Sequence, residues 1–174
     1  MLSAPSIVTA PEGDVIDLAK IRLFLRIDGE DLDGEIADYV LAVAGDIESM
    51  TSTRFRDQVV ELSADGFPDL LNLNIGPVNE VVAVWYRDRD GIDQLIDPAV
   101  YELFGSQLAK GVRTAPGKSW PSIGAARIRI ALQVGYGMDL PPSLSLALKE
   151  AVRSRFDGTP YDLFLATVND RIWL

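Results

Sequence analysis

Five carboxylates fall within eight residues, from Asp28 to Glu35, and acids at this density could do chemistry. They could ligate a cation, supply a catalytic acid pair, or simply charge a turn between two helices. A calcium-binding EF-hand loop needs acids at positions 1, 3 and 5, glycine at position 6 and glutamate at position 12. With Gly34 at position 6, Gly29 stands at position 1 and Val40 at position 12, so the pattern fails at both ends. The sequence therefore predicts a turn, and we expect no metal site and no cofactor.

The predicted turn joins two helices. Gly29 ends the first helix, and Asp31 caps the second. Asp33 and Glu35 then occupy the first turn of the second helix, where the helix dipole favours negative charge. Four acids share one face of this helix, opposite its apolar stripe: Asp31, Glu35, Asp38 and Asp46. We expect this acidic face to be solvated.

The charge of the chain limits its partners. The formal net charge is −10, and residues 27–48 hold eight acids and no base. Binding to duplex DNA through its phosphates needs a footprint of Lys and Arg side chains. The sequence thus argues against such binding, although a surface that DNA slides past without sticking remains compatible with it.

Most catalytic chemistry is excluded by composition. The chain has no histidine and no cysteine, which excludes Ser-His-Asp triads, imidazole acid–base catalysis and thiolate or imidazole metal sites. Residues 117–119 (Gly-Lys-Ser) resemble the end of a phosphate-binding loop, but Val112 occupies the position of its first glycine and Trp-Pro follows instead of a helix. Paired carboxylates can hydrolyse glycosides without histidine, so an Asp/Glu-dependent enzyme, with or without Mg²⁺, stays open as an alternative.

Apolar spacing predicts the elements that carry these residues. Helices are expected over residues 14–27, 36–50 and 139–158. Strands are expected over residues 56–66, 69–78, 79–92, 99–105 and 126–136, and a long loop over residues 105–125. The last strand alternates strictly, with Ile128, Ile130, Leu132, Val134 and Tyr136 on its buried side. Four aromatic residues could stack nucleic acid bases, but with few basic neighbours they are better explained as strand core: Trp85, Tyr86, Tyr101 and Phe104.

This layout predicts an α+β protein in which both chain ends form a small helical bundle around an inserted antiparallel β domain. The expected parts are a helical part (1–54), a β-rich insertion (55–137), a bundle helix (138–158) and a tail (159–174). The N-terminal residues lack a basic start and a long apolar run, so no signal peptide is expected. No window approaches the roughly 20 apolar residues of a membrane helix.

An opening stretch and four later phrases, in order, resemble the phage head–tail connector family, in particular its subgroup with a β insertion, which includes connectors of phage-like gene transfer agents. The first helix ends in "LRID" at residues 25–28, and the second ends in a phrase made of Ile47, Glu48, Thr51 and Arg54. "GPVNEVVAVWYRDRDG" at residues 76–91 is similar to the strand phrase of the subgroup. "SWP", "VGYG" and "LPPSLSLALKEAV" are similar to its later landmarks, so the resemblance covers nearly all of residues 15–157.

The resemblance implies a structural role without catalytic residues. Connector subunits form a ring, here expected to be dodecameric, beneath the portal of a capsid. They join the portal to a tail-side connector or stopper protein, and DNA passes through the ring without specific binding. The expected location is the neck of a virion or phage-like particle, after synthesis in the bacterial cytoplasm and with no membrane partner. The alternative to this structural role is a small binding module with an acidic helical face.

The C-terminal tail is apolar for a chain end, and exposed apolar clusters usually mark a contact. Either it folds back on its own bundle, or it docks on the portal or a neighbouring subunit. The candidate docking residues are Phe164, Val168, Ile172, Trp173 and Leu174. Within a connector ring, the acidic face would point to solvent or into the DNA channel, where it would keep phosphates from binding.

Overall fold

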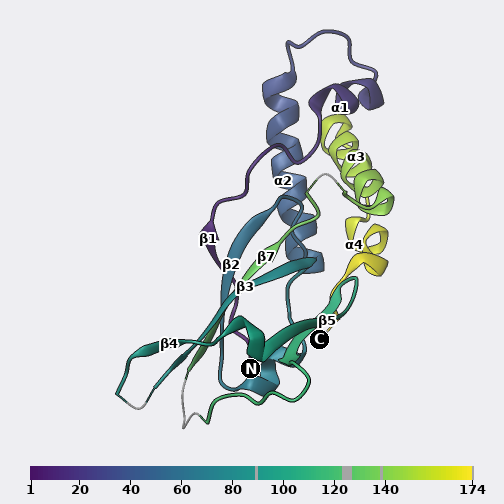
Figure 1. Cartoon of the computed structure of the whole chain (residues 1–174). Helices are drawn as coiled ribbons and strands as arrows, with labels where there is room; N and C mark the ends of the chain where they lie inside the picture. Colours follow the sequence, from purple (N-terminus) through teal and green to yellow (C-terminus); the bar gives the residue numbers. More distant parts are fainter. Residues whose placement is uncertain (89, 123–126, 138, 174) are drawn as a thin grey trace. The chain divides into compact units, whose positions relative to one another are not determined.

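The computed structural model describes residues 1–88, 90–122, 127–137 and 139–173 (Figure 1). The predicted α+β class is confirmed, since helices accompany an antiparallel sheet of five strands. Contacts divide the chain into two compact units. Unit 1 comprises Met1–Pro11, Asp57–Gly135 and Ile172–Leu174, and unit 2 comprises Glu12–Arg56 and Tyr136–Arg171.

Unit 2 is helical and draws on both halves of the chain. Its helices are α1 (Leu18–Leu25), α2 (Asp33–Thr51), α3 (Pro142–Asp157) and the short α4 (Leu163–Ala166), followed by a 3₁₀ turn, η3 (Val168–Asp170). Helix α1 begins at Asp17, whose side chain accepts a hydrogen bond from the Ala19 N–H at 2.9 Å. Helix α3 begins with a proline at its first turn and ends at Gly158 in the left-handed conformation.

The core of unit 2 lies between α2 and α3. Buried residues recur at helical spacing on α2 (Ile36, Val40, Val43, Ala44, Ile47) and on α3 (Leu144, Ala147, Leu148, Ala151, Val152). Ile21 of α1 and Phe55 complete this cluster. The apolar stripe predicted for the second helix is therefore the stripe that the bundle buries.

Unit 1 contains a five-stranded sheet in the order β1-β2-β7-β3-β4, with every neighbouring pair antiparallel. Its strands are β1 (Ser6–Thr9), β2 (Gln58–Ala64), β3 (Val78–Arg87), β4 (Asp93–Leu95) and β7 (Ile128–Val134). A separate hairpin pairs β5 (Tyr101–Ser106) with β6 (Ala109–Thr114). Two 3₁₀ segments, η1 (Phe67–Leu71) and η2 (Pro98–Val100), connect these strands.

One face of the sheet forms the core of unit 1. Ile128, Ile130, Leu132 and Val134 of the central strand β7 are fully buried, and Val60 and Leu62 of β2 lie in the same cluster. The predicted alternation is confirmed over Ile128–Val134 except at Ala131, which is also buried, and Tyr136 lies beyond the strand in unit 2. Tyr101 also lies in the core, and the Trp120 ring stacks on Phe67 at a centroid distance of 4.3 Å.

Several local predictions were wrong. Helix α1 begins at Leu18 rather than at residue 14, and Asp31 does not cap α2, because the cap position is Leu32 and makes no side-chain hydrogen bond. Much of the strand predicted over 69–78 is instead the η1 turn and an irregular segment. The loop predicted over 105–125 contains β6, and its residues 123–125 lie outside the described residues.

Strand β6 was missed because Gly111 looked like a loop residue. A Cβ placed there would lie 2.0 Å from the Leu71 carbonyl oxygen and 2.8 Å from Phe104 Cε1, so the backbones approach more closely than any side chain permits. The glycine is therefore required by this close approach within the packed unit. The unit boundaries also differ from the expected parts, because residues 1–11 and 172–173 contact the sheet unit.

Candidate functional surfaces

The acidic turn between α1 and α2 is closed by a single arginine. Arg22 of α1 donates to Asp33 Oδ2 at 2.5 Å, and its guanidinium lies 3.5 Å from Glu30 Oε1. The hydrogen bond to Asp33 raises the pKa of the Arg22 guanidinium above its usual value. Arg26 and Gly29 take the left-handed conformation that reverses the chain. The cluster thus includes acids that hold the turn together.

The acidic face begins at this turn. Asp31, Glu35 and Asp38 are exposed to solvent. Glu35 accepts a hydrogen bond from the Tyr39 hydroxyl at 2.9 Å, which raises the pKa of that tyrosine. In the described ranges, no three acids, or other residues able to ligate metal, come together in a group that could hold a cation. The face presents carboxylates to solvent over the first turns of α2.

The second half of the same face differs in character. Asp46 forms an ion pair with Arg155 of α3 and therefore helps to join two helices of the bundle. The exposed residues that continue the line of Asp38 along α2 are small: Ala42, Gly45 and Ser49. The four predicted acids thus divide into three solvated carboxylates and one structural one.

The tail folds on unit 2 through its first residues. Leu163 packs against the helical core, and Thr167 is fully buried with its hydroxyl donating to the Leu163 carbonyl at 2.9 Å. The Arg171 guanidinium lies 3.5 Å from the centre of the Phe164 ring and donates to the Phe164 carbonyl at 2.7 Å. This segment is an ordered element rather than a free end.

The last described residues lie on unit 1. The Ile172 Cδ1 atom is 3.1 Å from the point where Gly76 would carry a Cβ. Ile172 and Trp173 line a shallow hollow together with Asn72, Leu73, Leu108, Ala109 and Lys110. Of the predicted docking residues, Phe164 is 57% and Trp173 is 69% exposed, Val168 and Ile172 are half-buried, and Leu174 lies outside the described residues.

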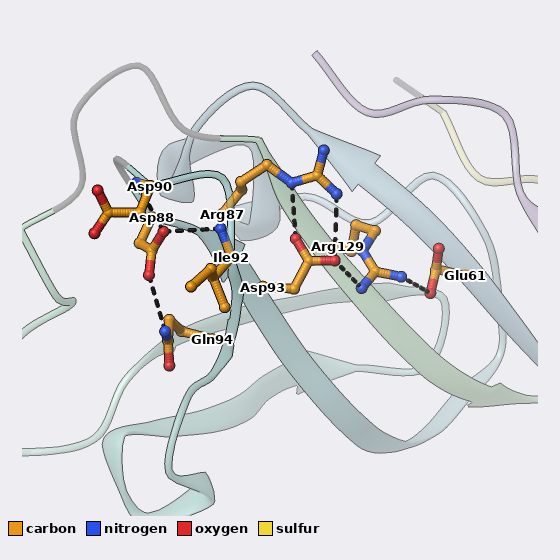
Figure 2. A network of polar contacts seen from close by, with 8 residues as sticks. All are labelled: Glu61, Arg87, Asp88, Asp90, Ile92, Asp93, Gln94 and Arg129. Carbon is orange, nitrogen blue, oxygen red and sulfur yellow. Dashed lines mark hydrogen bonds and ion pairs between the residues drawn. The ribbon is translucent and has the colours of Figure 1, made fainter.

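A charged network crosses the other face of the sheet in unit 1 (Figure 2). Arg129 of β7 donates to Glu61 of β2 at 3.1 Å and to Asp93 of β4 at 2.8 Å. Arg87 of β3 donates to Asp93 at 2.9 Å, which lowers the pKa of that carboxyl. The Arg129 guanidinium also lies 5.3 Å from the centre of the Trp85 ring. Sequence reasoning missed this network, and its one visible signal was Arg129 on the polar side of an alternating strand.

Asp88 organises the turn between β3 and β4, within the segment predicted as a strand over residues 79–92 (Figure 2). Its side chain accepts from Gln94 Nε2 at 2.8 Å and from the N–H groups of Ile92 and Asp90 at 2.9 and 3.0 Å. The hydrogen bond from Gln94, followed by the one from Ile92, lowers the pKa of the Asp88 carboxyl. Such a turn is an Asx motif that fixes the hairpin.

The fold of this chain is similar to that of chains in solved structures. No family model and no curated protein matches the chain. A chain from the "Virion of native gene transfer agent (GTA) particle" matches with a TM-score of 0.77 and 22% identity over 99% of this chain and 97% of that one. The two chains share one fold.

Two further structures agree with this result. A chain from the "Neck of empty GTA particle computed with C6 symmetry" matches with a TM-score of 0.76 and 21% identity, and one from the "Neck of native GTA particle computed with C12 symmetry" with 0.74 and 22%. Both matches cover 99% of this chain and 97% of the other. The α+β fold expected from the connector resemblance is therefore the fold of chains in these particles. In the described part of this chain, no helix is long and apolar enough to cross a membrane.

Proposed function

We propose that this protein is a structural head–tail connector subunit of a phage or phage-like particle. It forms a ring beneath the portal, joins the capsid to the tail side, and lets DNA pass. The observation that carries the proposal is the match of nearly the whole chain to chains of gene transfer agent particles, two of them in neck structures computed with C6 and C12 symmetry. The connector phrases in the sequence support the same role.

A non-enzymatic role accompanies this proposal. The chain offers neither histidine nor cysteine for catalysis. The charged groups of the sheet network are engaged with one another, as an arrangement that stabilises the sheet would require. Two alternatives are a binding module with an acidic face, which predicts no ring, and an Asp/Glu-dependent enzyme.

The acidic face has a role in this proposal. Asp31, Glu35 and Asp38 repel phosphates within a Debye length of about 8–10 Å, so a DNA strand passing them would not be retained. The small residues that follow on α2 leave room beside that path. Asp46 contributes to the bundle instead, through its ion pair with Arg155.

The tail is proposed to dock on the portal through its exposed aromatic residues. Leu163 and Thr167 hold the first part of the tail on unit 2, so docking falls to Phe164 and Trp173. Interface energy concentrates in such aromatic anchors, often at about 2 kcal/mol or more each.

Binding to capsids that carry the cognate portal but lack a tail tests the function. The purified protein should be monomeric or weakly associated at low salt, because subunits of net charge −10 repel one another. On the portal it should appear as a ring in electron micrographs. A monomer that never binds these capsids would contradict the connector function, and a stable ring in low salt without the portal would contradict templated assembly.

Trp173→Ala tests the tail, with Leu165→Ala as the control because that residue of the same tail is 66% exposed. Trp173→Ala should keep the melting temperature and weaken attachment to the portal by roughly 30-fold. Leu165→Ala should change neither quantity. Equal attachment of both variants would show that the tail does not dock through Trp173.

A further inference from the structure

The sheet of unit 1 has two open edges. β1 forms one edge and β4 the other, and in the described part of the chain no strand pairs with their outer sides. Open strand edges invite pairing with another chain, so proteins usually guard them with charges, prolines or covering segments. Pro5 precedes β1, and the pairing of β1 with β2 shifts register between Ile7 and Thr9, but β1 carries no charged side chain and no described strand covers either edge.

β1 is unguarded by charge. Residues 1–11 include no charged side chain, and all four residues of β1 are exposed. Ile7 and Val8 are 62% and 60% exposed, although β-branched residues favour a packed strand. The outer side of β1 can therefore pair with a strand of another chain.

β4 carries polar residues, but they are already engaged. The Asp93 carboxylate accepts from Arg87 and Arg129, and Gln94 donates to Asp88 (Figure 2). Beside these residues, Leu95 is 61% exposed. The Asp93 carboxylate thus binds arginines of its own sheet, and it does not keep another strand from pairing with the open edge of β4.

We infer that β1 of one copy pairs with β4 of the next copy, which continues the sheet from subunit to subunit around the ring. The inference rests on the proposed connector function, because a rotational ring needs two different surfaces that meet head to tail. These edges are two such surfaces at opposite ends of one sheet. A second copy is the favoured occupant because copies of net charge −10 meet with least repulsion along an uncharged segment such as residues 2–11.

The strand directions define the contact further. In a sheet of five antiparallel strands, the first and fifth run in the same direction. Neighbours in a ring of many copies differ by a small rotation, so β1 and the β4 of the adjacent copy would pair in parallel. A two-fold dimer would instead join β1 to β1 in antiparallel fashion, and the two arrangements give different cross-links.

Disulfide trapping tests the contact, since the chain has no cysteine of its own. Val8→Cys with Leu95→Cys places one thiol on each edge, and Val8→Cys with Leu146→Cys is the control because Leu146 of α3 is 55% exposed. Under mild oxidation on portal-bearing capsids and in concentrated solution, the edge pair should give a ladder of covalent oligomers at least tenfold above the control. Equal yields from both pairs would overturn the edge contact, and dimers from Val8→Cys alone would show β1–β1 pairing instead.

A charge placed on β1 separates this inference from the proposed function. Ile7→Lys should reduce ring assembly on the portal at least tenfold, whereas Leu23→Lys, at a residue of α1 that is 81% exposed, should not. Normal rings from Ile7→Lys, together with no edge cross-link, would overturn the edge contact and leave the connector function standing. Edge cross-links from a protein that never binds portal would uphold the contact and overturn the connector function.

Discussion

The outer face of the sheet and the exposed face of α2 each carry four prominent charged residues, and they use them in opposite ways. On the sheet, Glu61, Arg87, Asp93 and Arg129 alternate in sign and bind one another. On α2 and the turn before it, the four residues are all acids, and only Asp46 has an ion pair with another described residue. The paired charges on the sheet stabilise its surface, while the acids on α2 create a negative electrostatic field in the solvent.

The same contrast holds for the two units as wholes. Unit 2 has 16 acidic against 9 basic side chains, and unit 1 has 10 against 7. Most of the negative charge therefore belongs to the helical unit, whose solvated acids are candidates for repelling DNA. The nearly balanced sheet unit is the better candidate for contacts between copies. The predictions below test this division.

The largest effect on stability is expected from cavities in the two cores, one beneath the sheet and one between the helices. Leu132→Ala in β7 and Leu148→Ala in α3 each remove a fully buried side chain, which costs about 2–5 kcal/mol of unfolding free energy. Hydrogen exchange should show the loss first in the sheet amides for Leu132→Ala and first in the α2 and α3 amides for Leu148→Ala. Identical exchange patterns would mean that the two units unfold only together.

The next effect concerns the acidic face. Replacing Asp31, Glu35 and Asp38 with Lys raises the formal net charge by six and should create DNA binding. Three phosphate contacts imply a loss of affinity of roughly 40-fold between 50 and 200 mM salt, measured by fluorescence anisotropy.

The matched control for this variant carries the same charge change elsewhere. Asp57, Glu80 and Asp157 are exposed acids outside the face, and their replacement with Lys gives the same net charge. This control should bind DNA more weakly and should not hinder ejection of DNA from assembled particles. If both triple variants behave alike, only net charge matters and the acidic face has no special role.

A smaller effect is expected from the sheet network. Asp93→Asn removes the charge that Arg87 and Arg129 share, so the β3–β4 hairpin should lose stability and the melting temperature should fall by a few degrees. Asp38→Asn on α2, where no ion pair with another described residue is lost, should leave the melting temperature unchanged or raise it slightly. A larger fall in melting temperature for Asp38→Asn than for Asp93→Asn would contradict the division into paired and solvated charges.

The smallest effect is the dependence on pH at Asp88. The pKa of its carboxyl is lowered in the folded protein, so its stabilising contribution is complete above the ordinary aspartate pKa of about 3.9 and is lost as pH falls through the folded value. The melting temperatures of the protein and of Asp88→Asn should therefore differ at pH 7 and converge as the pH is lowered below about 4. A difference that persists at low pH would mean that charge at Asp88 does not stabilise the turn.

The fold was predictable where one residue pattern decides the burial of a whole element. The alternation over Ile128–Val134 and most of the apolar stripe of α2 each mark a face that the core covers. β6 was not predictable, because Val112 is fully buried in a segment otherwise rich in loop-like residues. Helix boundaries shifted by a few residues, since the first helix was predicted to begin at residue 14 whereas its cap is Asp17.

The candidate surfaces were predictable only in part. Charges on one helix can be placed from their spacing, so the acidic face was found from the sequence. Pairing across the chain cannot be placed in this way, because Arg129 meets Glu61 and Asp93 at separations of 68 and 36 residues. The same limit hid the pairing of Asp46 with Arg155, which lies 109 residues away.

The central position of β7 also governs the order in which the protein can be completed during translation. β2 and β3 both pair with β7, and the strand that joins them is synthesised last. When the ribosome has made residue 110, the nascent chain holds β1 to β5 with the middle of the sheet missing. β2 can pair with β1 and β3 with β4 at that stage, but the edges of β2 and β3 that face β7 must wait, unpaired, until residue 134 leaves the exit tunnel. Synthesis speed over residues 88–134 therefore sets how long this sheet is vulnerable to misassembly before the particle can use the subunit.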